Sequence, residues 1–524
     1  MPDVAVLAGP RATRREWTGL AVIALPCLLY SMDLTVLNLA VPHLSAELKP
    51  SSSQLLWIVD IYGFLLAGSL ITMGTLGDRI GRRRLLLIGA VAFAIASVFA
   101  AFSTSAEMLI VARALLGIAA ATLAPSTLSL IRNMFLDPKE RTIAIGVWIA
   151  SFSAGGAIGP LAGGILLSYF WWGSVFLVAV PLMAALLVLG PLFLPEYRDP
   201  QAGRLDILSV ALSLVAVLSV IYGIKRIAEH GLGREAAFAI VFGLAAGAAF
   251  VLRQQRLRNP LIDLRLFRSR AFSASLAVNI LGFFVAFGSF LFIAQYFQLV
   301  LGMEPLEAGL WTVPSAIAFI ASSTLTPIVA SRVRPAYVMA AGLALAAAGF
   351  LVLAGIGGQA DLAAIVIGYA VFSFGLAPAF TLATDLIVGT VEPEQAGAAA
   401  GLAETSSEFG GALGIAILGS VITSIYRGSM AGLAVDGVTA QEIDAARDTL
   451  GGAVAVAMAL PDKLGSDLLD KARGAFIQAF NMTAAICVLV VLAAAIFAAL
   501  LLRNVRAGSD PGQHPTRAAT AAEQ

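Results

Sequence analysis

The sequence predicts an all-α membrane protein with fourteen transmembrane helices, and two observations support this fold class. Hydrophobic residues make up 59% of the 524-residue chain and charged residues only 12%, with a mean hydropathy of +0.91. This composition lies outside the range of soluble globular proteins. Runs of about twenty apolar residues also recur along nearly the whole chain, each long enough to cross a hydrocarbon core of roughly 30 Å. We therefore expect lipid to surround this chain and no soluble domain to remain.

The apolar runs group as six, two and six. The first six predicted spans are 17–41, 54–76, 85–103, 108–131, 142–168 and 172–194. The middle two are 205–223 and 236–252. The last six are 272–301, 308–330, 336–356, 362–388, 398–426 and 475–502. The predicted parts are therefore an N-terminus (1–16), a first bundle (17–195), two additional helices (196–258), a second bundle (259–502) and a disordered tail (503–524).

Basic residues in the short loops predict the orientation of the chain. Lys and Arg fall in alternate connections, and the intervening connections of the first six spans carry almost none beyond Lys49. Because basic loops remain cytoplasmic, both termini are predicted to be cytoplasmic. Both flanks of the middle pair are basic, which allows zero or two crossings. The apolar content of that pair favours two.

One connection departs from the pattern of short external loops. Residues 427–474 are long and mixed in charge, with an apolar stretch at 450–460 that is too short to span. Charged residues flank this stretch at helical spacing. We expect a folded external hairpin packed on the mouth of the protein, and an unstructured loop is the alternative. Cys27 and Cys487 both lie in apolar spans and are interpreted as packing residues.

The strongest local motif is GTLGDRIGRRRLLL at 74–87, between the second and third spans. Gly74 and its two neighbouring glycines allow a tight turn and close helix approach. Asp78 can pair with an arginine such as Arg82 or cap a helix. The arginines alone fit a solvated basic loop, but an acid among three glycines does not.

This motif resembles the cytoplasmic signature of the major facilitator superfamily, and the resemblance covers essentially the whole chain. It implies two six-helix bundles, with two extra central helices here. It also implies that Asp78 and Arg82 act as conformational switch residues that latch the bundles together. The matching connection at 327–334 has basic residues but no acid, so its latch is expected to be weaker.

Two further motifs lie in the fourth and fifth spans. Arg113 interrupts an apolar helix, where a charge needs a partner. It resembles the fourth-helix arginine of the superfamily, which implies either proton transfer or bracing of neighbouring helices. In SAGGAIGPLAGGIL, Gly155, Gly159 and Gly163 lie on one helix face, and Pro160 favours a bend. Generic small-residue packing would explain this pattern, but it also resembles the antiporter signature of the superfamily, which favours export.

Asp33 and Asp60 place carboxylates in the first and second spans. A low dielectric disfavours a charged carboxylate, so such a group can carry a proton or neutralise a bound cation. The alternative is a structural acid that only pairs with Arg113. Ionisable residues within membrane spans usually have a function, which favours a functional role. With RNMFLDPKERTIAIGVW and the fourteen-helix plan, these spans resemble the quaternary-ammonium and multidrug efflux subgroup of proton antiporters. That resemblance implies a central proton and substrate site at Asp33 and a further acid at Asp60.

The thirteenth span holds Glu404 and Glu408 one helical turn apart, so both point to one side. Two carboxylates so close favour a shared proton. The resemblance places an essential acid at Glu404, and Glu408 is expected to be its partner or a substrate contact. Some subgroup members carry an acid in the tenth span. Residues 310–327 contain none here, so monovalent cations are expected to be preferred over divalent ones.

Aromatic residues supply the remaining candidates for cation binding, since a delocalised cation can rest on ring faces. Trp57 and Phe64 lie one turn on either side of Asp60. Weaker candidates, because membrane aromatics often only pack, are Trp148, Phe152, Trp311 and Phe319.

The sequence offers no chemistry for an enzyme. It contains no phosphate-binding Gly-Lys-Ser or Gly-Lys-Thr loop, only three histidines and balanced charge, 33 basic against 32 acidic residues. We expect no cofactor, no metal site and no nucleic-acid partner. The expected function is proton-coupled export of lipophilic cations by a plasma-membrane monomer, with proton rather than sodium coupling resting on the resemblance. The alternatives are export of a neutral or weakly charged natural product, and a receptor or scaffold that uses a transporter fold.

Overall fold

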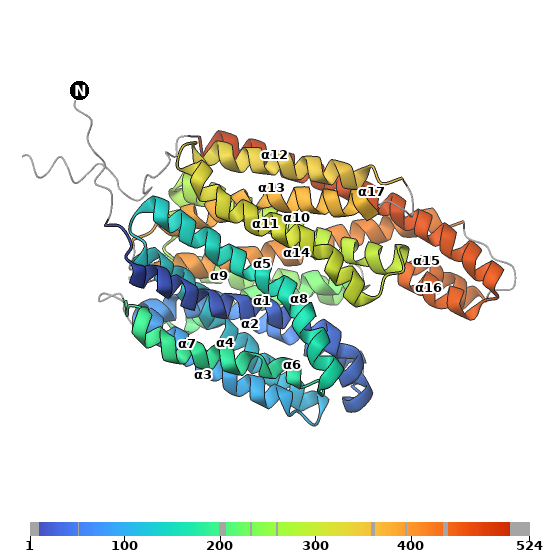
Figure 1. The fold of residues 1–524 in the computed structure, drawn as a ribbon, viewed down its shortest axis with the longest axis horizontal. Coiled ribbons are helices and arrows are strands. Elements are labelled where there is room, and N and C mark those ends of the chain that lie inside the picture. Colours follow the sequence, from blue (N-terminus) through green and yellow to red (C-terminus); the bar gives the residue numbers. More distant parts are fainter. Residues whose placement is uncertain are drawn as a thin grey trace, which may run out of the picture.

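The computed structural model describes residues 10–50, 52–198, 206–230, 233–257, 260–357, 362–392, 396–432 and 439–503. All regular secondary structure in these residues is helical (Figure 1). The first bundle contains α1 (Arg14–Leu48), α2 (Ser52–Ile80), α3 (Arg82–Ala101), α4 (Ala106–Met134), α5 (Pro138–Tyr169), α6 (Ser174–Leu177) and α7 (Ala179–Phe193). The middle pair is α8 (Ile207–His230) and α9 (Arg234–Gln254). The rest comprises η1 (Leu264–Arg268), α10 (Arg270–Gln295), η2 (Tyr296–Val300), α11 (Pro305–Ala330), α12 (Pro335–Ala354), α13 (Leu362–Gly389), α14 (Ala396–Met430), α15 (Ala440–Asp448), α16 (Leu450–Ala459) and α17 (Asp462–Leu501).

The number of spans agrees with the prediction. Thirteen helices in the described ranges are long and apolar enough to cross a membrane. The first helix, α1, is 35 residues long and contains the first predicted span, which brings the total to fourteen. The middle pair is present as α8 and α9, so the prediction of two extra central helices is confirmed. Most of the predicted tail, from residue 504 onward, and residues 1–9 of the predicted N-terminus lie outside the described residues.

The segment predicted as a long loop at 427–474 is mostly helical. It continues α14 to Met430 and then forms α15, α16 and the first turns of α17. Helix α17 begins at Asp462, well before the predicted residue 475, because Lys463, Asp467 and Lys471 alternate in sign at i, i+4 spacing and support a helix outside lipid. The unstructured alternative is therefore wrong for the described part. Its placement outside the cell stays a prediction.

Side-chain caps explain how this hairpin folds. At the start of α15 the Thr439 hydroxyl accepts from the Glu442 amide at 3.3 Å, and the Glu442 carboxylate accepts from the Thr439 amide at 2.9 Å. These bonds from Thr439 hold the pKa of Glu442 below its usual range. This reciprocal capping box satisfies amide groups that a helix start leaves without partners. The Tyr426 hydroxyl of α14 then donates to the Ala446 carbonyl at 2.8 Å, which ties the hairpin to the second bundle.

The two bundles meet mainly along two helix pairs, and α4 also contacts α14. Helix α5 packs against α11, and α2 packs against α14. We call the end of the molecule where α14 begins the clasp end, and the opposite end, which carries α15 and α16, the hairpin end (Figure 1). Basic connections that the sequence assigned to one side of the membrane meet at the clasp end, where Arg334 donates to the Arg503 carbonyl at 3.2 Å. Which side of the membrane this end faces stays a prediction.

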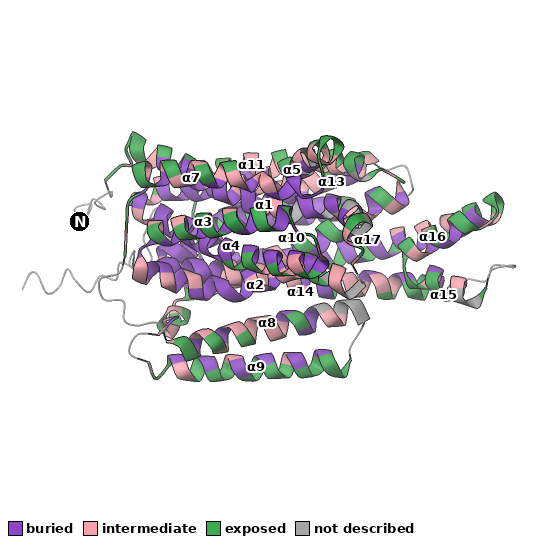
Figure 2. Cartoon of the chain, turned by 90° about the horizontal axis from the view of Figure 1, so that it is seen from below, coloured by how far each residue is buried: buried purple, intermediate pink, exposed green. Residues whose placement is uncertain are grey.

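The middle pair lies beside the seam between the bundles (Figure 2). Helix α8 contacts both α2 and α14, whereas α9 packs mainly on α8. The outer face of α9 exposes Phe238 and Val241, at 71% and 65% of their surface, as expected of a helix that faces lipid. Helix α8 therefore covers one side of the junction between the two bundles.

A polar network at the clasp end holds α8 to α9. Arg253 donates to both oxygens of Asp206, at 2.6 and 2.9 Å, and Asp206 also accepts from the Ser209 amide at 3.2 Å. The hydrogen bonds from Arg253 hold the pKa of Asp206 well below its usual range. Gln254 continues the network to the Ser209 hydroxyl at 2.8 Å. The carboxylate both caps α8 and joins it to the end of α9.

Glycines set the close approach of α1 to α5. Gly155, Gly159 and Gly163 are all buried, and they share one face of α5, as predicted. A Cβ on Gly155 would lie 2.1 Å from the Leu28 carbonyl oxygen of α1. The backbones therefore touch, which any larger residue would prevent. The side chain of Pro160 lies outside the described residues, and its predicted bend stays a prediction.

Replacing Gly155 with valine is expected to push α1 away from α5 and to destabilise the first bundle by roughly 1–3 kcal/mol, the usual cost of overpacking. The measurement is the thermal midpoint of the detergent-purified protein by size-exclusion chromatography. Gly428→Val is the matched control, because open space surrounds a Cβ at Gly428. Equal midpoints for the two variants would show that the glycine is not needed for packing.

Candidate functional site

The acid in the first span and the arginine in the fourth are brought together. Arg113 of α4 contacts Asp33 of α1 at 2.7 Å between Nη1 and Oδ2, and their side chains are 1% and 9% exposed. A buried charge in an apolar bundle needs such a counter-charge. The pairing that the sequence left as a structural alternative is therefore present, and it sits inside the first bundle.

Two groups of α2 complete the surroundings of Arg113. Its Nε donates to the Ile58 carbonyl at 3.3 Å, and its guanidinium lies 4.5 Å from the centre of the Tyr62 ring. The Tyr62 hydroxyl is buried and has no hydrogen-bond partner among the described residues. The sequence analysis missed Tyr62, since one tyrosine in an apolar helix carries no signal. An acid, an aromatic face and an unpartnered hydroxyl thus surround one cation.

The second pair of acids lies on α14 and faces the first bundle. Glu404 and Glu408 are half-buried one turn apart, and their charges interact. The Tyr30 hydroxyl of α1 donates to Glu408 Oε1 at 2.8 Å. This hydrogen bond crosses from one bundle to the other. Tyr30 was also missed, because its role depends on a residue 378 positions away.

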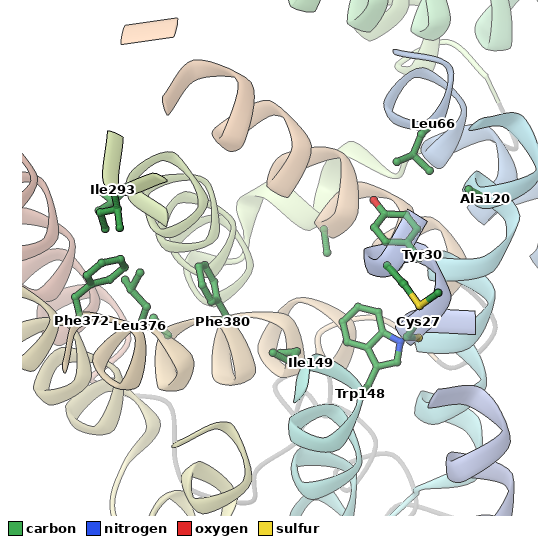
Figure 3. Packing of buried hydrophobic residues seen from close by; sticks show 14 of the residues in the cluster. Cys27, Tyr30, Leu66, Ala120, Trp148, Ile149, Ile293, Phe372, Leu376 and Phe380 are labelled. Carbon is green, nitrogen blue, oxygen red and sulfur yellow. The ribbon is translucent and has the colours of Figure 1, made fainter. Parts of the chain in front are cut away.

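Predicted aromatics of α5 pack beside this contact. The Phe152 ring lies 5.4 Å from Tyr30 and 4.7 Å from Trp148, edge to face in both cases. The Trp148 indole donates to the Thr127 hydroxyl at 3.0 Å and lies beside Cys27 and Tyr30 in Figure 3. Trp148 is 3% exposed and its indole N–H already has a partner, so its role is to pack against Phe152. Phe152 packs on the ring of Tyr30, whose hydroxyl donates to Glu408.

The acid and aromatic face predicted on α2 turns elsewhere. Phe64 packs against Ile221 of α8 and Ala412 of α14, and Trp57 is 42% exposed, with ring centres 6.2 Å apart. Helical spacing puts Asp60 on this same face, and it is half-buried. Tyr62 points instead toward Arg113. Phe64 therefore packs at the seam covered by α8, on a different face of α2 from Tyr62.

The weaker aromatic candidates of α11 do not join the acids. Trp311 is 37% exposed. The Phe319 ring lies 6.0 Å from that of Phe380, which packs 4.4 Å from Phe283. This aromatic group belongs to the second bundle.

The predicted switch residues make a contact between the bundles at the clasp end. Arg82 donates to Asp78 at 2.6 and 2.9 Å, and the Asp78 carboxylate accepts from the amides of Gly397 and Ala398 at 3.1 and 3.0 Å. Those amides begin α14, so an anion of the first bundle caps a helix of the second. A Cβ on Gly74 would lie 2.3 Å from the Gly397 carbonyl oxygen, which explains why this position needs glycine.

A second ion pair joins the bundles at the same end. Arg141 of α5 contacts Asp385 of α13 at 2.8 Å, and the Thr142 hydroxyl donates to the other carboxylate oxygen at 2.6 Å. The side chains of Arg141 and Asp385 are 3% and 11% exposed. Asp385 lies inside a predicted apolar span, so the signal that identified Asp33 also applied to it.

Comparison with known proteins agrees with this geometry. A family profile for the Major Facilitator Superfamily matches residues 23–415. The chain belongs to the major facilitator superfamily. It is 44% identical to "Multidrug efflux pump LfrA" of Mycolicibacterium smegmatis over 94% of this chain and 98% of that protein. It is 36% identical to "Methyl viologen resistance protein SmvA" of Salmonella typhimurium, over 89% of this chain and 94% of that protein.

Two further comparisons extend these matches. The chain is 31% identical to "Tetracenomycin C resistance and export protein" of Streptomyces glaucescens over 97% of its length and 95% of that protein. The crystal structure of the human organic anion transporter MFSD10 (TETRAN) superposes with a TM-score of 0.57 at 16% identity, covering 91% of this chain and 99% of that one. The structural likeness shows the shared fold. The chain is thus a multi-pass membrane transporter of this superfamily rather than an enzyme.

Asp385→Asn is expected to loosen the clasp end, because it leaves the buried Arg141 without its counter-charge. Removing one partner of a buried pair costs roughly 3–5 kcal/mol. Ser323 of α11 is fully buried, and a Cβ on Gly146 of α5 would lie 2.6 Å from the Ser323 carbonyl oxygen. The reporter is a cysteine at position 323, with Cys27 and Cys487 replaced by alanine. It is expected to react with a maleimide at least about tenfold faster in the Asp385→Asn variant.

The matched control for this labelling is Glu235→Gln. It breaks the Arg226–Glu235 pair, which has a 2.7 Å contact but side chains that are 32% and 74% exposed, and exposed pairs contribute little. Equal labelling rates in the Asp385→Asn variant and this control would contradict a role for Asp385 in closing the clasp end.

Proposed function

We propose that this protein is a proton-coupled antiporter of the fourteen-helix drug-exporting group. It exports lipophilic cations of the quaternary ammonium type across a bacterial inner membrane, with both termini cytoplasmic. The relatives named for multidrug efflux and for resistance to methyl viologen support drug export at the level of class. The cationic nature of the substrate and the coupling to protons are inferred from the residues of the candidate site.

The observation that supports a cation and a proton is the presence of membrane-embedded acids in both bundles. Asp33 lies in the first bundle, paired with Arg113, and Glu404 and Glu408 lie on α14 of the second, with Glu408 bonded to Tyr30. Carboxylates in an apolar bundle attract either a proton or an organic cation, and the two compete. Such competition is the coupling that an antiporter requires.

Alternating access then follows from the contacts between bundles. The Asp78 contact with α14 and the Arg141–Asp385 pair hold the clasp end together. In the proposed cycle, substrate enters when these contacts open and leaves when they re-form. Protonation of the acids from the other side discharges the cation. The switch roles of Asp78, Arg82 and Gly74 follow from this cycle.

Export of a neutral natural product is the second candidate, because one relative is named for tetracenomycin C resistance and export. The fold would be the same. A neutral substrate gives no reason for Asp33 in the first bundle and Glu404 and Glu408 in the second, so the cationic substrate is the better-supported proposal.

Asp33→Asn is expected to abolish proton-coupled efflux, since it removes the titratable group and leaves Arg113 without a counter-charge. The measurement is ethidium efflux from proteoliposomes under an imposed proton gradient, with a sodium gradient run in parallel. We expect the variant to fall to the rate of protein-free vesicles, and Asp33→Glu to retain part of the activity.

Asp263→Asn is the matched control, because Asp263 lies at an exposed turn and caps the Arg265 amide at 2.9 Å. The control should transport at the wild-type rate. Full ethidium efflux by Asp33→Asn would overturn the assignment of Asp33. Efflux by the wild type under a sodium gradient alone would overturn proton coupling.

Monovalent cations are expected to be exported more effectively than divalent ones, since α11 carries no carboxylate between residues 310 and 327. The comparison is ethidium against methyl viologen, a dication, in the same vesicles. The relative named for methyl viologen resistance makes this the informative pair. Tighter coupled export of methyl viologen than of ethidium would contradict the preference.

A further inference from the structure

A hydrogen bond between Tyr30 and Glu408 joins the acid pair of the second bundle to the first bundle. Tyr30 lies on α1 one turn before Asp33, so the two residues share a helix face. Its ring is buried, with 6% of its surface exposed, and is held edge to face by Phe152. The hydroxyl is therefore fixed in place and aimed at Glu408 Oε1 at 2.8 Å.

The strength of this bond depends on whether Glu408 is ionised. A hydroxyl that donates to a carboxylate makes a charge-assisted bond, roughly twice as strong as the bond it makes to a neutral carboxyl group. Protonation of Glu408 therefore weakens a contact between the bundles. The contacts at the clasp end use Asp78 and Asp385, which are satisfied by arginines and helix amides, so they do not depend on Glu408 in this way.

Other titratable groups surround the contact. Glu404 lies one turn away on α14, and its charge acts on both Glu408 and Tyr30. Tyr62 of α2 is in electrostatic range of Tyr30, Glu408, Asp33 and Arg113. Asp60 lies on the α2 face that meets α14 through Phe64. Of these groups, Glu408 accepts a hydrogen bond from the Tyr30 hydroxyl across the seam.

We propose that Tyr30 is a positioning residue that couples the protonation of Glu408 to the closing of the two bundles. This role of Tyr30 rests on the proposed proton antiport and specifies how the protein senses the proton. Ionised Glu408 holds α14 to α1 through the Tyr30 hydroxyl. Protonated Glu408 weakens that hold and allows the bundles to separate.

The test is a double-mutant cycle of Tyr30→Phe and Glu408→Gln, because coupled residues give effects that do not add. Tyr30→Phe removes one hydroxyl and keeps the ring that packs on Phe152. The assay is ethidium efflux from proteoliposomes over a series of pH values, with ethidium binding to the detergent-purified protein as a second readout. Tyr426→Phe is the control, since that buried hydroxyl bonds the Ala446 carbonyl in the hairpin.

We expect Tyr30→Phe to move the pH midpoint of efflux upward by about one unit, because a carboxylate that loses a donor takes up a proton more easily. Ethidium binding should stay within about twofold of wild type, since the ring and the neighbouring acids are retained. The double variant should match Glu408→Gln alone. Tyr426→Phe should keep the wild-type pH profile.

Three results would overturn this coupling. The first is a Tyr30→Phe profile that matches the wild type, and the second is an additive effect of the two substitutions. The third is an equal shift in Tyr426→Phe, which would point to a general effect of losing a buried hydroxyl. A wild-type protein that fails to move ethidium under a proton gradient would instead overturn the proposed function, and the inference with it.

Discussion

A guanidinium inside an apolar helix bundle requires a counter-charge, and the pairing of Arg113 with Asp33 meets that requirement. Because the two side chains are almost completely buried, α1 and α4 must keep the separation that a 2.7 Å contact allows. Helix α2 is bound to the same charge through the Ile58 carbonyl and the Tyr62 ring. Three helices of the first bundle are thus organised around one cation, and Tyr30 is presented to the second bundle from that frame.

The contacts between the bundles differ in kind along the molecule. At the clasp end, Asp78 caps α14 while held by Arg82, and Asp385 pairs with Arg141. Near the acids, the Tyr30 hydroxyl of α1 donates to Glu408 of α14. The clasp end is therefore joined by charged contacts, whereas the strength of the Tyr30–Glu408 bond changes with one proton. That difference makes the Tyr30–Glu408 contact the natural place for a proton to act.

The fold was largely predictable because helices that cross lipid must consist mainly of apolar residues. Spans of about twenty apolar residues identified the helices, including the middle pair, since every backbone polar group in lipid must be bonded within its own helix. The helical part of 427–474 was less visible, because caps such as Thr439 and Glu442 act outside the membrane. Asp385 is an acid within an apolar span, as Asp33 is, but its partner Arg141 lies 244 residues away on the other bundle, which no local pattern indicates.

Residue type and spacing alone determined that this chain crosses a membrane many times. They also identified the ionisable residues that are costly within membrane spans and therefore indicate function, namely Asp33, Asp60, Arg113, Glu404 and Glu408. Only the tertiary structure decided which of them meet. It paired Asp33 with Arg113, joined Glu408 to Tyr30, and packed Phe64 beside Ile221 of α8. The physical reason is that hydropathy reports the solvent of each residue locally, whereas a hydrogen bond or ion pair depends on how distant helices pack.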